Sequence, residues 1–106
     1  MPHAELSFSA DLALDLRSIL SNVEAVILRH DPDAGECKGR AYPAEVFHHT
    51  HCLLSVTMLR RKHRDEPFTQ ALLHDLEVEM RQHLVADSFL SIGISYSDAN
   101  YITTNV

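Results

Sequence analysis

Two long amphipathic segments, each lying between two strand-like segments, constrain the fold of this chain more than any other feature. The first spans residues 11–32, and the second begins near Pro67. Apolar side chains recur at helical spacing in both, which predicts two helices that each bury one face. The apolar positions of the first segment are Leu12, Leu16, Ile19, Leu20, Val23, Val26 and Ile27. Those of the second are Phe68, Leu72, Leu73, Leu76, Met80 and Leu84.

The residues at the ends of these segments predict where the helices begin and end. Ser9 or Asp11 can cap the start of the first helix, and Pro32 cannot continue it. Pro67 favours the first turn of the second helix, directly after the acidic residues at positions 65 and 66.

Four further segments are predicted to be strands. Residues 2–8 alternate between apolar and polar side chains, which is the pattern of a half-buried strand. Residues 37–49 and 51–61 are the second and third strands, and Pro43 places the second at an edge or an irregularity. Residues 87–98 are the fourth strand. The tail from residue 99 onward is short and polar.

This order of elements predicts one α+β domain over residues 1–106, built in two layers from two βαβ units at about 2–48 and 50–97. A helical crossover makes the strands of each unit parallel, so both helices cover one face of a four-stranded sheet. The other face is apolar in places on the third and fourth strands, which favours a partner subunit. Two βαββαβ folds fit: the ferredoxin-like split βαβ fold, and the tautomerase fold, in which three subunits pack their sheets together.

The charge pattern favours a small anionic ligand. The formal net charge is −6, which argues against a nucleic-acid binder. The basic residues are nevertheless clustered, notably in the segment "RRKHR" at positions 60–64. No apolar run reaches the length of a membrane span, and no signal peptide is recognisable, so we expect a cytoplasmic protein. Cys37 and Cys52 form no CxxC pair and are expected to be reduced.

Pro2 is the candidate catalytic residue. We expect aminopeptidase to remove Met1, because the following residue is small, which leaves Pro2 with a free secondary amine. An efficient base has a pKa near the ambient pH, and a free α-amino group already titrates near ~7.7–8.0. An apolar pocket and nearby cations favour the neutral amine. The rigid ring at the head of a strand would also hold the nitrogen in one position.

Several segments of the chain are typical of one family: "MPH" at the start, "CKGRA" on the second strand, the basic connection ending in Arg64, "RQHL", "LSIGISYS" and the closing "NYITTNV". Through them the chain resembles the 5-carboxymethyl-2-hydroxymuconate isomerase family of the tautomerase superfamily. The likeness covers nearly the whole chain, and Pro2 is its one sharp signature. The chain differs from the family by a shorter connection, "YPAEVFHHTH", between the second and third strands.

The resemblance implies a trimeric tautomerase fold and a cofactor-independent isomerase of unsaturated 2-hydroxy (enol) dicarboxylic acids, as used in the catabolism of aromatic compounds. It implies that Pro2 carries the proton and that arginines hold the substrate carboxylates. Arginine suits this task because its planar, permanently charged fork matches carboxylate oxygens. Arg40 and Arg64 are the expected substrate-binding residues, and Lys38 is a weaker candidate. No cofactor and no metal are expected.

Other interpretations of the sequence remain open. The segment "HHTH" at positions 48–51 has imidazoles that suit a transition metal, but a polar turn fits its spacing better. The protein could instead be a non-catalytic small-molecule binding module on a ferredoxin-like scaffold, as a dimer or an appended regulatory domain. It could also be a tautomerase-fold protein with a changed activity, because the fold alone does not determine function.

Overall fold

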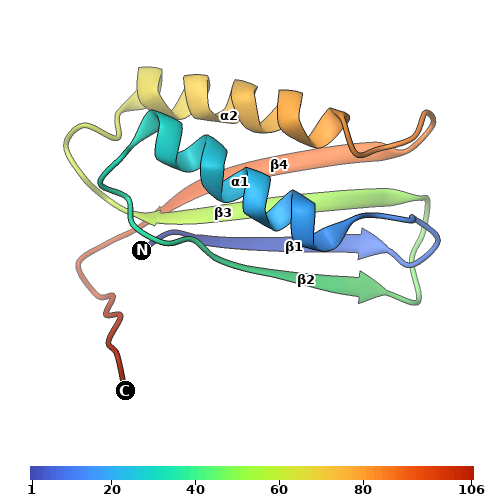
Figure 1. Ribbon diagram of the computed structural model, residues 1–106, viewed down its shortest axis with the longest axis horizontal. Coiled ribbons are helices and arrows are strands. Elements are labelled where there is room, and N and C mark those ends of the chain that lie inside the picture. Colours follow the sequence, from blue (N-terminus) through green and yellow to red (C-terminus); the bar gives the residue numbers. More distant parts are fainter.

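The computed structural model describes residues 1–106 and confirms the predicted order of elements (Figure 1). The elements are β1 (His3–Ser9), α1 (Leu16–His30), β2 (Lys38–Ala44), β3 (His51–Leu59), α2 (Glu66–Arg81) and β4 (Phe89–Ser97). Residues 98–106 follow β4 without regular structure. No helix is long and apolar enough to span a membrane.

The four strands form one sheet in the order β2-β1-β3-β4. β1 pairs with β2 in parallel, β3 pairs with β4 in parallel, and the two central strands, β1 and β3, are antiparallel. Each βαβ unit therefore joins two neighbouring strands. In the ferredoxin-like fold the two strands of a βαβ unit are separated by a strand of the other unit, and the βαβ unit is therefore called split. The sheet order excludes the ferredoxin-like alternative and confirms Pro43 on an edge strand.

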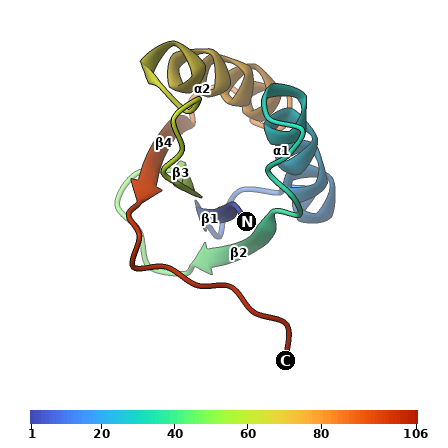
Figure 2. The same ribbon diagram turned by 90° about the vertical axis from the view of Figure 1, so that its left-hand side faces the viewer.

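Both helices lie on one face of the sheet, as predicted (Figures 1 and 2). The core between the layers takes its sheet side chains from one face of each strand, such as Leu6 on β1 and Leu54 on β3. Val23 of α1 and Leu76 of α2 close it from above, and all four side chains are fully buried. Burial of this apolar face is what stabilises the two amphipathic helices, since isolated helices of this length are marginal in water.

The start of α1 differs from the prediction. The N-cap is Asp15, whose carboxylate accepts a hydrogen bond from the Ser18 amide, and neither Ser9 nor Asp11 caps the helix. Both of those side chains are already bonded to the start of β3 or to the residue before it. The Ser9 hydroxyl bonds the backbone of His51, and the Asp11 carboxylate accepts a hydrogen bond from the Thr50 hydroxyl. Tertiary partners thus outcompete local capping, and the chain becomes helical only at Leu16.

The start of α2 agrees with the sequence. Asp65 is the N-cap, its carboxylate accepts a hydrogen bond from the Phe68 amide, and Pro67 lies in the first turn. Pro67 does not destabilise the helix there, because a backbone amide in the first turn has no acceptor within the helix and its absence loses no hydrogen bond.

The face of the sheet opposite the helices is more polar than expected. On β3 and β4 it carries mainly small residues, and only Leu53 and Phe89 are large apolar side chains with substantial exposure. The prediction that this face is apolar in places on β3 and β4 thus holds at Leu53 and Phe89, at one end of the sheet. In the histidine-rich segment, residues 48–50 form a bend and His51 begins β3, and no group of three potential metal ligands occurs in the structure.

Candidate active site at the head of β1

Pro2 lies directly before β1 and is almost fully buried, with less than 2% of its surface exposed. The Lys38 amide donates a hydrogen bond of 2.9 Å to the Pro2 carbonyl, so β2 holds this residue on one side. β3 flanks the head of β1 on the other side, where His3 pairs with Thr57. The Pro2 ring is therefore fixed in position by the two neighbouring strands.

Two predicted cationic residues lie beside the head of β1 on the edge strand β2. In the parallel register Lys38 is opposite His3, and Arg40 is opposite Glu5. Paired residues point to the same face of a sheet, so both cations lie on the open face. Arg40, an expected substrate-binding residue, therefore lies next to β1.

Arg40 is held by three neighbours. Its Nε and Nη2 atoms each lie 3.0 Å from the Glu5 carboxylate, and its Nη1 donates to His3 and to the Lys38 carbonyl. Most of its donor capacity is therefore used within the protein. Lys38 is freer: its ammonium group contacts only Glu36, at 3.0 Å, and its side chain is 46% exposed. Two of its three donors are available, which makes Lys38 a stronger anion-binding candidate than the sequence indicated.

His3 joins Arg40 to the C-terminal tail. Its Nδ1 lies 3.2 Å from Arg40 Nη1, and its Nε2 lies 3.0 Å from the Tyr101 hydroxyl oxygen. Because a guanidinium can only donate, the Nδ1 of His3 accepts and its Nε2 carries the proton. Burial and the nearby Arg40 guanidinium lower the pKa of His3, which favours this neutral form.

Tyr101 is a residue of this site that the sequence analysis missed. Its hydroxyl donates a hydrogen bond of 3.1 Å to the carbonyl of Met1, the residue bonded to the Pro2 nitrogen. The tail that carries it leaves the end of β4 and passes the edge of the sheet formed by β2 (Figure 2). The contact spans 98 residues, from His3 to Tyr101, and the tail has no periodic pattern that points to it.

Arg64 does not join these residues. Its side chain is only 6% exposed, and its guanidinium makes two contacts to Asp31, of 2.9 and 2.8 Å. A third contact, of 2.6 Å, goes to the Leu59 carbonyl. Burial raises the pKa of Asp31, but hydrogen bonds from His63 and Arg64 outweigh it and keep that pKa below its usual value. Arg64 thus forms a buried ion pair between the end of α1 and the connection after β3.

Both cysteines are free thiols. Cys37 lies next to the head of β1, where burial and the Glu24 carboxylate raise its pKa to about 11. Burial also raises the pKa of Cys52. Neither thiol is a good nucleophile near neutral pH, because the reactive species is the thiolate.

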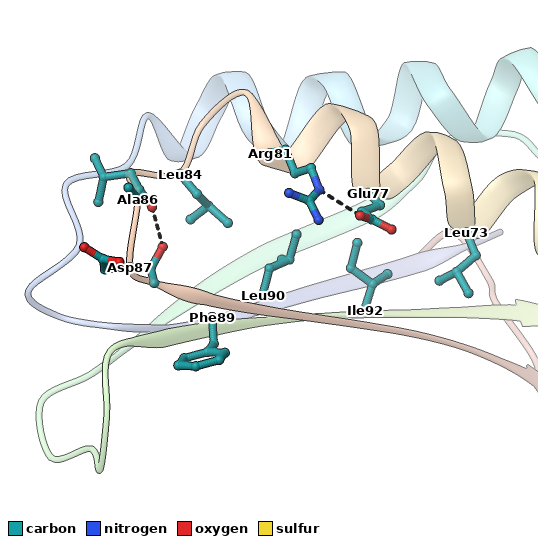
Figure 3. A pocket seen from close by; sticks show the side chains of 11 residues that line it. Leu73, Glu77, Arg81, Leu84, Ala86, Asp87, Phe89, Leu90 and Ile92 are labelled. Atoms are coloured by element: carbon teal, nitrogen blue, oxygen red, sulfur yellow. Dashed lines mark hydrogen bonds and ion pairs between the residues drawn. The ribbon is translucent and has the colours of Figure 1, made fainter.

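A groove of about 630 Å³ lies between α2 and the start of β4 (Figure 3). It is at the opposite end of the sheet from Pro2. Leu73, Leu84, Leu90 and Ile92 give it apolar walls between α2 and β4. Arg81 lies at its rim and is paired with Glu77. Because β4 begins here and β1 ends here, no predicted site residue lines this groove.

Several solved structures share this fold. A 5-carboxymethyl-2-hydroxymuconate isomerase from Deinococcus radiodurans R1 gives a TM-score of 0.80 at 20% sequence identity, over 99% of this chain and 90% of that chain. A 5-carboxymethyl-2-hydroxymuconate delta-isomerase gives 0.71 at 16% identity, over 100% of this chain and 87% of that chain. A fused 4-OT symmetric trimer gives 0.74 at 12% identity, over 97% of this chain and 93% of that chain.

The structural similarity confirms the βαββαβ tautomerase fold, which is the fold of the tautomerase-superfamily isomerases. No protein-family model matches the sequence, and no curated protein matches it in sequence.

Proposed function

We propose that this protein is a cofactor-independent isomerase that moves a proton in an unsaturated 2-hydroxy dicarboxylic acid, with the amine of Pro2 as base and acid. The observation that supports this most is the position of Pro2, which is buried at the head of β1 and hydrogen-bonded to the strand β2 that carries Lys38 and Arg40. The proposal includes removal of Met1, because the nitrogen of Pro2 is an amide until that bond is cleaved. The similarity to two 5-carboxymethyl-2-hydroxymuconate isomerases supports the same substrate class.

The chemistry needs one group that accepts a proton and returns it. The neutral Pro2 amine takes the proton of the enol hydroxyl, which leaves a dienolate. The protonated amine then delivers that proton to a carbon of the conjugated system, so that substrate and product have the same formula. No metal or redox partner is required by this proton balance.

The cations bind the two ends of the substrate in this proposal. Lys38 has free donors on the open face of β2 and is assigned to a carboxylate. Arg40 contributes its positive charge and its remaining donor, while Glu5 fixes the orientation of its guanidinium. Arg64 was expected to bind substrate as well, and its buried pairing with Asp31 argues for a structural role instead. We therefore assign substrate binding to Lys38 and Arg40.

The assembly in this proposal is a homotrimer in the cytoplasm, with the sheets of three chains facing one another. The similarity to a tautomerase-fold trimer supports it. The open faces of the three sheets carry His3, Lys38 and Arg40, so the trimer would enclose these side chains with the substrate.

The test combines mass spectrometry with kinetics. Intact mass should show that Met1 is absent, and ketonisation of 2-hydroxymuconate should be followed by the loss of its conjugated absorbance. Pro2→Ala should reduce kcat by about 100-fold or more, since it removes the positioned secondary amine. Pro43→Ala is the matched control, because Pro43 is an exposed proline on the edge strand β2. Retention of Met1, or equal turnover by Pro2→Ala and wild type, would refute the proposal.

One observation favours a second candidate, a tautomerase-fold protein with a changed substrate. Arg64 is engaged by Asp31, so the chain offers fewer free guanidinium groups than its sequence indicates. A substrate with one carboxylate would then suffice. Comparing turnover of 2-hydroxymuconate with that of a monocarboxylic enol acid, such as phenylpyruvate in its enol form, distinguishes the two candidates.

A further inference from the structure

We infer that the Tyr101 hydroxyl donates a hydrogen bond to the substrate oxygen that becomes negatively charged next to the Pro2 amine, and that His3 is the positioning residue that orients it. This inference rests on the proposed function. It assigns to the C-terminal tail a direct part in the reaction, and it names the group that would stabilise the dienolate.

The carbonyl of Met1 marks where the substrate oxygen would lie. The carbonyl carbon of Met1 is bonded to the Pro2 nitrogen, and the carbonyl oxygen accepts a hydrogen bond of 3.1 Å from the Tyr101 hydroxyl. The two intervening bonds add at most about 2.6 Å, so the hydroxyl oxygen lies within about 6 Å of the Pro2 nitrogen. When Met1 is removed, this carbonyl leaves and the hydroxyl loses its acceptor. A ligand oxygen in contact with the amine would occupy the same space.

The hydrogen-bond directions favour donation toward the ligand. A carbonyl can only accept, so the single hydrogen of the Tyr101 hydroxyl points to the oxygen of Met1. His3 Nε2, at 3.0 Å, and the Thr103 hydroxyl, at 2.6 Å, must then both donate to the tyrosine oxygen. Two incoming hydrogen bonds polarise the O–H bond and strengthen its donation.

The orientation of His3 is itself fixed. Arg40 donates to its Nδ1 and so holds the proton on Nε2, and Glu5 anchors the Arg40 guanidinium. The rings of His3 and Tyr101 meet edge to face, with centroids 6.0 Å apart. The lowered pKa of His3 agrees with a neutral imidazole in this position. A chain of donors therefore runs from Arg40 through His3 and Tyr101 to the space beside Pro2.

Three variants test the inference by kinetics on 2-hydroxymuconate with Met1 removed. Tyr101→Phe keeps the ring but loses the donor, and we expect kcat to fall by about 100-fold with KM changed less than threefold, as for other single donors to a developing oxyanion. His3→Gln keeps an N–H at about the Nε2 position and should be more active than His3→Ala. Thr104→Val is the matched control in the same tail, where the Thr104 side chain is exposed.

A binding experiment separates a direct contact from a loosened tail. Adipate and 2-oxoadipate differ only at C2, which is a methylene group in adipate and in 2-oxoadipate is the carbonyl whose oxygen Tyr101 is expected to contact. Wild type should bind 2-oxoadipate about tenfold more tightly, and Tyr101→Phe should bind the two equally. A general disturbance of the tail would weaken both ligands alike.

Failure of the Tyr101 inference can be distinguished from failure of the proposed function. If wild type is active and Pro2→Ala is inactive, but Tyr101→Phe keeps the turnover and the ligand preference of wild type, the inference is wrong and the proposed function survives. If wild type keeps Met1 or has no turnover of enol acids, the proposed function is wrong and the inference falls with it.

Discussion

Replacing Arg64 with Met tests whether the buried ion pair is structural. The side chains of Arg64 and Asp31 are 6% and 4% exposed, so neither is stabilised much by water. Met keeps most of the volume of Arg64 and removes its charge. Asp31 then keeps only His63 and the Asp33 amide as donors, and the Leu59 carbonyl loses its contact with the guanidinium.

The expected cost is about 3–5 kcal/mol, the usual result of leaving one member of a buried ion pair without its partner. For a chain of this size, about 4 °C of Tm corresponds to each kcal/mol, so Tm should fall by about 12–20 °C. Scanning calorimetry at a fixed protein concentration measures this, because oligomer dissociation makes Tm depend on concentration. Arg61→Met is the matched control: Arg61 is exposed in the same connection and should change Tm by less than about 2 °C.

A double variant sharpens the test. Asp31→Leu combined with Arg64→Met replaces the pair by apolar side chains and should recover most of the lost stability. The structural interpretation would be refuted if Arg64→Met left Tm unchanged and instead raised the KM for 2-hydroxymuconate. That result would return Arg64 to the substrate-binding role that the sequence predicted.

Two further predictions concern titratable groups. The pKa of Asp31 is lower in the folded protein than in the unfolded chain, where it is about 3.9. The stability that Asp31 contributes is therefore fully present above the pKa of the unfolded chain, and it is lost as the pH falls through the pKa of the folded protein. Urea unfolding should accordingly show Asp31→Asn much less stable than wild type at pH 7, with a difference that shrinks below about pH 4; a constant difference would contradict this. Because the Cys37 pKa is raised to about 11, its thiolate should be scarce near pH 8, and the folded protein should react with iodoacetamide about 100-fold more slowly at this residue than the urea-unfolded chain, as measured by peptide mass spectrometry. Equal rates in the folded and the unfolded protein would show that the Cys37 thiol is not shielded from the reagent and that its pKa is not raised.

The elements were predictable because they depend on local periodicity. The alternation of residues 2–8 and the helical spacing after Leu16 are visible in the sequence, and Pro43 signals the edge strand. The start of α1 was mispredicted because Ser9 and Asp11 bond to residues about 40 positions away. The sheet order could not be derived either, since the same element string also fits a split βαβ arrangement.

The site was predictable only in part, for a similar reason. Arg40 was expected on the second strand, but its place beside β1 depends on the pairing of β1 with β2, which the element string alone does not determine. Arg64 is paired with Asp31, which is 33 positions away and was not distinguished in the sequence from other acidic residues near a turn. Tyr101 was missed because it approaches Met1 and His3 from the far end of the chain, in a tail without periodicity.

The most direct test of the central claim is the proton titration of the Pro2 nitrogen. The chain has four prolines, so a protein labelled with 15N only in proline gives four nitrogen signals. Only a free amine titrates, whereas a proline nitrogen in a peptide bond does not. We predict that one of the four signals shifts with pH, with a midpoint at or below the ordinary range of an α-amino group, about 7.7–8.0, and that this signal is absent in Pro2→Ala. Four signals that stay constant across the pH range would show that Pro2 remains acylated and would contradict the proposed mechanism.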